Sequence, residues 1–210
     1  MKIEGLKDTI SWYDKNAEKY ADSAERVLPV ELLEKFLSML PQSSRVLDAG
    51  CGSGRDSRFL HQKCAVVTGI DISEGLLQEA RKRDENVSFV KGDMTAMPFA
   101  DGSYDGVWSH ASLVHLETIS DVKKALGEFS RVLKTGGILH LFVKAQAGKE
   151  KTAIVSDSLS NHDRFFRYYT EEELRDLVAT VGFGHLDTTL LPDPHGRPEV
   201  TWIALFAKKT

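Results

Sequence analysis

Short apolar runs alternate with segments of helical periodicity between residues 43 and 144, and this alternation restricts the possible folds more than any other feature. The pattern predicts strands over 45–49, 65–71, 87–90, 104–109 and 138–143, and helices over 56–63, 74–83 and 121–134. The last strand contains few polar residues, as is typical of a sheet that is buried on both faces. Strands and helices that alternate in this way predict a doubly wound α/β fold with a mostly parallel sheet.

The carboxyl-terminal part of the chain departs from this alternation. Thr170 and Glu173 have the spacing of a capping box, which predicts a helix that begins after Thr170 and ends at Gly182. Two strand-like runs follow over 185–191 and 200–207, and a short loop rich in proline separates them. No helix fits into this loop, and a parallel pair needs a longer crossover, so the two strands should form an antiparallel hairpin.

The chain of 210 residues is predicted to form one domain with four parts. Residues 1–42 have helical periodicity and should form an N-terminal helical cap. Residues 43–144 form the core described above, and residues 170–210 form the C-terminal helix and hairpin. The connection over 145–169 has no clear period, so we expect it to be a loop that serves as a lid or a substrate loop.

Composition excludes several classes of protein. The net charge of −4 provides no global attraction to nucleic acid or to an anionic membrane. The two cysteines are too few for a disulfide framework or a cysteine-rich metal site, so we expect reduced thiols and no bound metal. The chain has no apolar leader and no run long enough to span a bilayer, which favours a cytoplasmic protein.

A glycine-rich turn follows the first predicted strand, with Gly50, Gly52 and Gly54 just before a helix. Glycines at such a turn let the backbone bend sharply and let a ligand approach the main chain closely. A dinucleotide site would need a glycine where Arg55 stands, and it would place the carboxylate of Asp48 beside a pyrophosphate. Because like charges repel strongly in a cleft, the turn favours a ligand that carries a cationic group and no phosphate.

Two further acids end the next two predicted strands. Asp71 can accept hydrogen bonds from both hydroxyl groups of a ribose, and Asp93 can accept one from the exocyclic amine of a purine. Ile72 and Met94 offer apolar contacts to the purine ring. The carboxyl ends of neighbouring parallel strands share one crevice, so these groups should meet there with Asp48. Together they would bind an amine, a ribose and an adenine, which is the outline of S-adenosylmethionine (SAM).

Five segments strengthen this interpretation by their order and spacing: VLDAGCGSG (46–54), GIDIS (69–73), GDM (92–94), YDGV (104–107) and LKTGG (133–137). They resemble the successive motifs of class I SAM-dependent methyltransferases, and the resemblance covers roughly residues 45–144. It implies a Rossmann-like sheet of seven strands that ends in an antiparallel hairpin. One departure is Thr135, where that family commonly has proline; this affects a turn and leaves the chemistry unchanged.

The resemblance implies a SAM-binding core over 43–144 and S-adenosylhomocysteine (SAH) as the product. The residues expected to contact the cofactor are Asp48, Gly50, Cys51, Gly52, Gly54, Asp71, Ile72, Asp93, Met94, Ser109 and His110. Each acid also has a structural interpretation, as a turn residue or at a helix terminus, and the functional interpretation depends on their occurring together.

Candidate acceptor-binding residues come from three separate segments. His115 follows the fourth core strand, and its imidazole could contact the substrate or take a proton; packing without a catalytic role is the alternative. Tyr13 and Tyr20 could cover the bound cofactor from the N-terminal helix. Arg164 and Arg167, interleaved with aromatic residues, could hold an anionic or planar acceptor, or they could be exposed on an anchored loop.

Three functions remain open at this point. The first is methyl transfer from SAM to a small-molecule acceptor by in-line displacement. The second is methylation of a tRNA or protein, with Arg164, Arg167 and residues 144–151 as a local docking patch. The third is a SAM-binding regulatory protein without turnover. Neither the acceptor atom nor the oligomeric state follows from the sequence.

Overall fold

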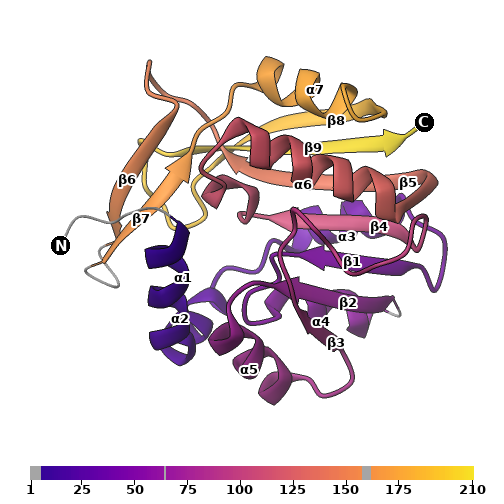
Figure 1. Ribbon diagram of the computed structural model, residues 1–210, viewed down its shortest axis with the longest axis horizontal. Helices are drawn as coiled ribbons and strands as arrows, with labels where there is room; N and C mark the ends of the chain where they lie inside the picture. Colours follow the sequence, from indigo (N-terminus) through magenta and orange to yellow (C-terminus); the bar gives the residue numbers. More distant parts are fainter. Residues whose placement is uncertain (1–5, 64, 158–161) are drawn as a thin grey trace.

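A seven-stranded sheet with helices on both faces forms the centre of the computed structural model, which describes residues 6–63, 65–157 and 162–210 (Figure 1). The strands lie in the order β3 (Ser88–Lys91), β2 (Val66–Asp71), β1 (Arg45–Ala49), β4 (Tyr104–His110), β5 (Leu133–Lys144), β9 (Thr201–Lys209) and β8 (Phe183–Pro192). The pairs from β3 to β5 are parallel, and β9 runs antiparallel to β5 and to β8. The predicted doubly wound sheet and its C-terminal antiparallel hairpin are therefore confirmed.

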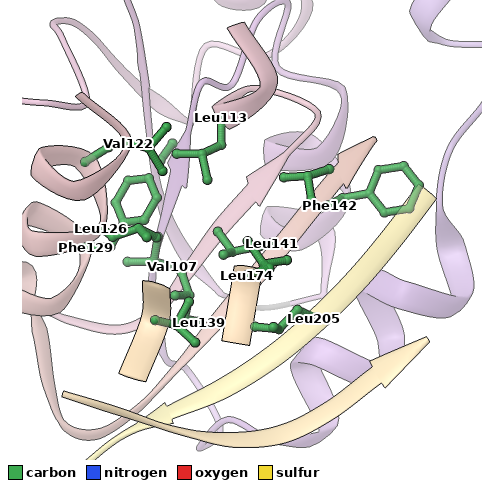
Figure 2. Close-up of a cluster of buried hydrophobic side chains, with 14 of the residues drawn as sticks. Val107, Leu113, Val122, Leu126, Phe129, Leu139, Leu141, Phe142, Leu174 and Leu205 are labelled. Carbon is green, nitrogen blue, oxygen red and sulfur yellow. The ribbon is translucent and has the colours of Figure 1, made fainter. Parts of the chain in front are cut away.

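The two faces of the sheet are covered by different helices because successive side chains of a strand point to opposite sides. On β1, Val46 packs in one cluster with α3 (Val30–Ser38), α4 (Arg55–Gln62) and α5 (Glu74–Arg83). Leu47 packs in another cluster with α6 (Ile119–Val132) and α7 (Glu171–Ala179). Figure 2 shows this second cluster, in which side chains of α6 meet those of the central strands. The core thus lies in two layers, one on each side of the sheet.

Helix starts follow the capping residues predicted from the sequence. The hydroxyl of Ser73 accepts a hydrogen bond from the backbone N–H of Leu76 at 3.2 Å, so α5 begins at the predicted residue. Thr170 accepts a hydrogen bond from the N–H of Glu173 at 3.1 Å and begins α7. Each such cap stabilises a helix by about 1 kcal/mol because it satisfies an N–H group that has no partner inside the helix.

The connection over 145–169 differs from the prediction. Residues 152–157 and 162–167 form β6 (Thr152–Asp157) and β7 (His162–Arg167), which pair antiparallel in a separate two-stranded sheet. The expectation of a loop without regular structure is therefore wrong for these residues. Polar residues interrupt both strands, so neither has the apolar alternation by which a strand is recognised. The role of the connection over 145–169 as a lid or substrate loop stays a prediction.

The N-terminal helices lie on the same side of the molecule as this hairpin (Figure 1). Helix α1 (Leu6–Lys15) packs against β7 and α5, and α2 (Ala17–Ala24) packs against α5. The parallel strands β1, β2 and β4 end beneath them, at the cavity described next. The N-terminal helices and the hairpin therefore cover the edge of the sheet at which the predicted acids lie.

Candidate active site

A cavity of about 860 Å³ lies at the carboxyl ends of the parallel strands. Its walls include the glycine turn after β1, the residues just after β2 and β3, and the ends of β4 and β5. Helices α1 and α2 and strand β7 complete it. The volume is in the range of sites that enclose a ligand of drug size, so a nucleoside and a small second ligand can fit together.

The glycine turn forms one wall because its backbone leaves no room for side chains. Gly50 has a φ of +80°, and a Cβ atom built there would lie 2.2 Å from the Cβ of Ser112. Ser112 is itself held in place, because its hydroxyl donates to the carbonyl of Ala49 at 2.7 Å. The backbone conformation and the close approach together require glycine at this position.

Asp71 ends β2 and stabilises the glycine turn. One carboxylate oxygen accepts the N–H of Gly52 at 2.8 Å, and the other accepts the N–H of Ser73 at 2.8 Å. Each oxygen keeps a further lone pair, so the carboxylate can also accept hydrogen bonds from a diol. Burial raises the pKa of Asp71, although these backbone N–H groups oppose the rise.

Asp48 is only 2% exposed and accepts a hydrogen bond from the hydroxyl of Ser57 at 2.6 Å. Burial and the nearby charge of Asp56 raise the pKa of Asp48 well above its usual range. Burial also favours a higher pKa for Asp56, but the positive charge of Arg55 outweighs burial and lowers the pKa of Asp56. Asp48 is thus an acid that a cationic ligand would convert to its charged form.

The third acid lies in a more open position. Asp93 is exposed and accepts hydrogen bonds from both the N–H and the hydroxyl of Thr95 at 2.8 Å. Ile72 is 36% exposed and Met94 is partly buried, and both line the cavity with Asp93. An acceptor oxygen and two apolar side chains therefore border the same part of the cavity, as predicted for a purine.

His115 ends a short 3-10 helix, η1 (Leu113–His115), at the other end of the cavity. Its Nδ1 lies 2.9 Å from the carbonyl oxygen of Phe165, and its Nε2 lies 3.4 Å from the hydroxyl of Tyr13. Because a carbonyl only accepts, Nδ1 carries the proton and Nε2 is an acceptor that faces the Tyr13 hydroxyl. Burial and the positive charge of Arg164 lower the pKa of His115 to about 4, so its imidazole is neutral at pH 7.

The two candidate arginines of β7 lie in different surroundings. Arg164 lines the cavity and donates from Nη1 to the hydroxyl of Tyr13 at 2.8 Å. Arg167 is not among the described residues that line the cavity, and its Nη2 donates to the carbonyl of Glu117 at 3.0 Å. Residues three apart on a strand point to opposite faces, which explains the separation. The predicted pair of arginines is thus not brought together.

Lys144 lines the cavity, whereas the sequence analysis placed it in a surface patch. The residue is 3% exposed, and its Nζ lies 3.5 Å from the ring centroid of Phe166 and 5.6 Å from that of Trp202. Lys144 is the last residue of β5, and Asp48 and Asp71 likewise lie at the carboxyl ends of their strands. The rule that strand ends share one crevice could have identified it.

Two further polar residues, not singled out from the sequence, attach the N-terminal helices to the glycine turn and to α5. Asp14 accepts hydrogen bonds from the hydroxyl of Ser73 at 2.6 Å and from the N–H of Gly75 at 2.9 Å. Arg55, on the other side, donates from Nη1 to the carbonyl of Val27 at 2.7 Å. Such long-range contacts have no local pattern in the sequence.

Most of the predicted site residues line this one cavity. They are Tyr13, Tyr20, Asp48, Gly50, Cys51, Gly52, Asp71, Ile72, Asp93, Met94, His110, His115 and Arg164. Gly54, Ser109 and Arg167 are not among its described lining residues. Ser109 is fully buried, and its hydroxyl lies 2.9 Å from that of Ser112, so it supports the wall from behind.

The side chains of Cys51 and His110 are uncharged in this setting. Burial raises the pKa of the Cys51 thiol well above its usual value, so Cys51 is a protonated wall residue and a poor nucleophile. Burial lowers the pKa of His110 to about 3. The other cysteine, Cys64, lies outside the described residues.

Neither a metal cluster nor a membrane span is found in the described ranges. Within 6–63, 65–157 and 162–210, no three His, Cys, Asp or Glu side chains gather in a way that could hold a metal ion. Over the same residues, no helix is both long enough and apolar enough to cross a bilayer.

Comparisons with known proteins identify the family. The sequence profile of the methyltransferase domain family matches residues 47–141. A provisionally assigned methyltransferase of Encephalitozoon cuniculi is 34% identical over 94% of this chain and 93% of its own length. A malonyl-[acyl-carrier protein] O-methyltransferase of Erwinia pyrifoliae is 37% identical over 86% of this chain and 66% of its own length. This chain therefore belongs to the class I SAM-dependent methyltransferases, and its methyl donor is SAM.

Solved structures show the same fold. A SAM-dependent methyltransferase of Methanosarcina mazei superposes with a TM-score of 0.75 at 22% identity, over 87% of this chain and 97% of that one. The 1,6-didemethyltoxoflavin-N1-methyltransferase of Burkholderia thailandensis, solved with its substrate and SAH, also has a TM-score of 0.75 at 22% identity, over 98% of this chain and 87% of that one. The chain spans between 42% and 68% of the length of the malonyl-[acyl-carrier protein] O-methyltransferases that it matches.

The residues present fit the cofactor. Gly50 and Gly52 line the cavity without side chains, so a ligand can approach the main chain closely there. The acids that border this part of the cavity suit a nucleoside with a cationic amino acid and no phosphate.

Proposed function

We propose that this methyltransferase acts on a small-molecule acceptor that is enclosed in the cavity beside SAM. The observation that carries this proposal is that one cavity is lined both by the predicted cofactor residues and by the candidate acceptor residues. The cavity of about 860 Å³ extends from the glycine turn to His115 and Arg164 beneath the N-terminal helices. A structural neighbour with bound 1,6-didemethyltoxoflavin supports a small acceptor. The relatives named for malonyl-[acyl-carrier protein] are named for an acyl group that is carried on a protein.

At the cofactor end, we assign each group by its chemistry. Asp71 would accept the ribose hydroxyls, and Asp48 would receive the amino group of the methionine part. Asp93 would accept the exocyclic amine of adenine, with Ile72 and Met94 against the ring. The remaining predicted cofactor contacts that line the cavity are Gly50, Cys51, Gly52 and His110, whereas Gly54 and Ser109 are not among its described lining residues.

Bound SAM supplies a methyl group on a positively charged sulfur. The protein itself needs to align the acceptor, exclude water and leave the lone pair of the nucleophile free. His115 fits the role of an aligning group together with Tyr13, because its Nε2 and the Tyr13 hydroxyl lie next to each other in the wall of the cavity. A neutral imidazole with a pKa of about 4 is a weak base, so we assign His115 to contact with the acceptor.

Methylation of a tRNA or protein, the alternative function, is less well supported by the structure, because part of its predicted docking patch is buried. The proposed docking patch included Lys144 and Arg167, and both side chains are buried at 3% and 9% exposure. They are therefore not available to phosphates on a surface. The expected cytoplasmic location remains a prediction.

The test is incubation of the protein with methyl-labelled SAM and a fractionated cell extract, followed by separation of small molecules, RNA and protein. We expect the label in the small-molecule fraction. Label in RNA or protein that is lost at high salt would support the alternative instead. If SAM binds by calorimetry but no fraction acquires label, a SAM-binding protein without turnover is the remaining explanation.

A further inference from the structure

Helix α1 forms part of the cavity wall, and an acid near its end holds this helix against α5. The residues of α1 that line the cavity are Thr9, Ile10, Trp12 and Tyr13. Asp14 is exposed and is not among the described lining residues. Its Oδ1 accepts hydrogen bonds from the hydroxyl of Ser73 at 2.6 Å and from the N–H of Gly75 at 2.9 Å, both at the start of α5. Any effect of Asp14 on a ligand must therefore act through α1 or α5.

The backbones of α1 and α5 approach each other closely at the same place. A Cβ atom built at Gly75 would lie 2.7 Å from both the Cα and the carbonyl oxygen of Asp14. These are backbone atoms of a helix, so they cannot turn aside as the end of a flexible side chain can. Glycine is a poor helix former, yet alanine at this position would force the two helices apart. The position of α1 therefore depends on the absence of a side chain at residue 75.

Ser73 connects this contact to the glycine turn. Its hydroxyl donates to Asp14, and its backbone N–H donates to Oδ1 of Asp71 at 2.8 Å. The other carboxylate oxygen of Asp71 accepts the N–H of Gly52. Burial is the main cause of the raised pKa of Asp71, and the nearby charge of Asp14 adds to it. One unbroken set of hydrogen bonds thus runs from α1 through Ser73 and Asp71 to the glycine turn.

The neighbouring residue attaches α1 on its other side. The hydroxyl of Tyr13 accepts a hydrogen bond from Arg164 at 2.8 Å and lies 3.4 Å from Nε2 of His115. Helix α1 is thus held by α5 through Asp14 and by β7 and η1 through Tyr13. Removal of the contact with α5 should loosen α1 while the contacts of Tyr13 keep it near the cavity.

We propose that Asp14 is a positioning residue for SAM, which holds α1 over the cavity and keeps Asp71 oriented towards the ribose. A ligand that lies between α1 and the strand ends contacts both, so bound SAM and the docked helix stabilise each other. The proposal rests on the assignment of Asp71 to the ribose. It is independent of the identity of the acceptor, so it can be tested with SAH alone.

Gly75→Ala tests the docking of α1 without removing any hydrogen-bonding group. Alanine should strengthen α5 itself, so a weaker helix would not explain a loss of binding. We expect the SAH affinity of the full chain, measured by calorimetry, to fall by about tenfold, because α1 is displaced. Gly127→Ala is the matched control, since Gly127 lies in α6 with no atom within 4 Å of a Cβ, and it should leave the affinity unchanged. Equal SAH affinity in the two variants would overturn the proposal.

Asp14→Ala tests the path through Asp71. It should weaken SAH binding about five- to tenfold, whereas Glu18→Ala, which removes an exposed acid of α2, should have no effect. When Asp71 is already replaced by alanine, Asp14→Ala should have a much smaller effect, because the path to the ribose is interrupted. Additive losses would show that Asp14 does not act through Asp71.

The Asp71→Ala variant alone separates this proposal from the assignment on which it rests. If Asp71→Ala weakens SAH binding and Asp14→Ala does not, only the role of Asp14 is refuted. If Asp71→Ala leaves SAH affinity unchanged, the assignment of Asp71 to the ribose is refuted, and the role of Asp14 is refuted with it.

Trp12 reports separately whether α1 is docked. It is 8% exposed and is one of three tryptophans in the chain, so subtracting the spectrum of Trp12→Phe in each background isolates its fluorescence. In ligand-free Gly75→Ala we expect emission at longer wavelength, which indicates exposure to water, and saturating SAH should reverse the shift. Loss of SAH affinity without this shift would contradict positioning through α1. A lower Tm with full SAH affinity would reveal a purely structural contact.

Discussion

The proposed cofactor end of the cavity, at the glycine turn and Asp71, and the proposed acceptor end, at His115 and Arg164, are built in different ways. The cofactor end consists of one continuous backbone turn and of acids at or just after the carboxyl ends of β1, β2 and β3. The acceptor end consists of side chains that η1, β5, β7 and α1 bring together from distant parts of the chain. A backbone site tolerates few substitutions, whereas a side-chain site can change its ligand by single replacements.

The largest effect is expected at the backbone of the cofactor end. Gly50→Ala should lower the free energy of unfolding by about 2–4 kcal/mol, because alanine is strained at a φ of +80° and its Cβ would clash with Ser112. Thermal or urea unfolding measures this, and calorimetry should show a loss of SAM binding. Gly102→Ala is the control, since Gly102 has a φ of +61° with no atom within 4 Å of a Cβ. Equal losses in both variants would show that the contact with Ser112 is unimportant.

Asp71→Ala tests the side chain that supports that backbone. We expect SAM and SAH affinity to fall by about 1–3 kcal/mol, since an acceptor of two backbone N–H groups and of the ribose is lost. Calorimetry on the folded variant measures the change, and Asp176→Asn on α7 is a surface control. Unchanged affinity would remove Asp71 from the cofactor site.

His115→Ala tests the acceptor end separately. Turnover of the labelled acceptor should fall by about ten- to thirtyfold, which corresponds to one lost hydrogen bond, while SAH affinity is retained. Tyr13→Phe should have a smaller effect, since it removes only a hydroxyl near Nε2. If His115→Ala weakens SAH binding as much as turnover, the two ends are not independent.

The smallest expected effect, taken per unit of pH, is a pH dependence that belongs to the cofactor end. The pKa of Asp48 is raised in the free protein, so binding of a cationic amino group favours its ionised form and releases a proton. SAM affinity should therefore increase as pH rises towards that pKa, by at most about tenfold per pH unit. The stability of the free protein depends on pH in the opposite direction to its SAM affinity. The native state holds this proton longer than the unfolded state, so the free energy of unfolding falls with rising pH between the two pKa values.

Calorimetry of SAM binding in buffers of different ionisation enthalpy measures the proton release directly. The Asp48→Asn variant should bind SAM without this release. The same pH dependence in both proteins would assign it to another group.

Much of the fold could be predicted because it depends on local patterns. The apolar runs at β1, β2 and β4, and the caps at Ser73 and Thr170, act within a few residues of the chain. The hairpin β6–β7 was missed because its strands carry polar residues along much of their length. Its position depends on packing against α1 and on the burial of Phe166, and neither has a local signal.

The site divides in the same way. Asp48, Asp71 and Asp93 could be placed together because each lies at or just after the carboxyl end of a parallel strand. The sequence analysis could not assign Arg164 and Arg167 to opposite faces, because the alternation of side chains is informative only once the strand β7 is known. Lys144 was assigned to a surface, although its place at the end of β5 puts it inside the cavity.

The sequence by itself determined the sheet, the glycine turn and the acids of the cofactor end. These features arise from hydrophobic periodicity, backbone conformation and strand ends, all of which are properties of neighbouring residues. Only the tertiary structure decided which cations and rings line the end of the cavity at His115. Those groups lie far apart in the sequence, and their burial, charge and orientation depend on the packing of the N-terminal helices and of β7 against the sheet.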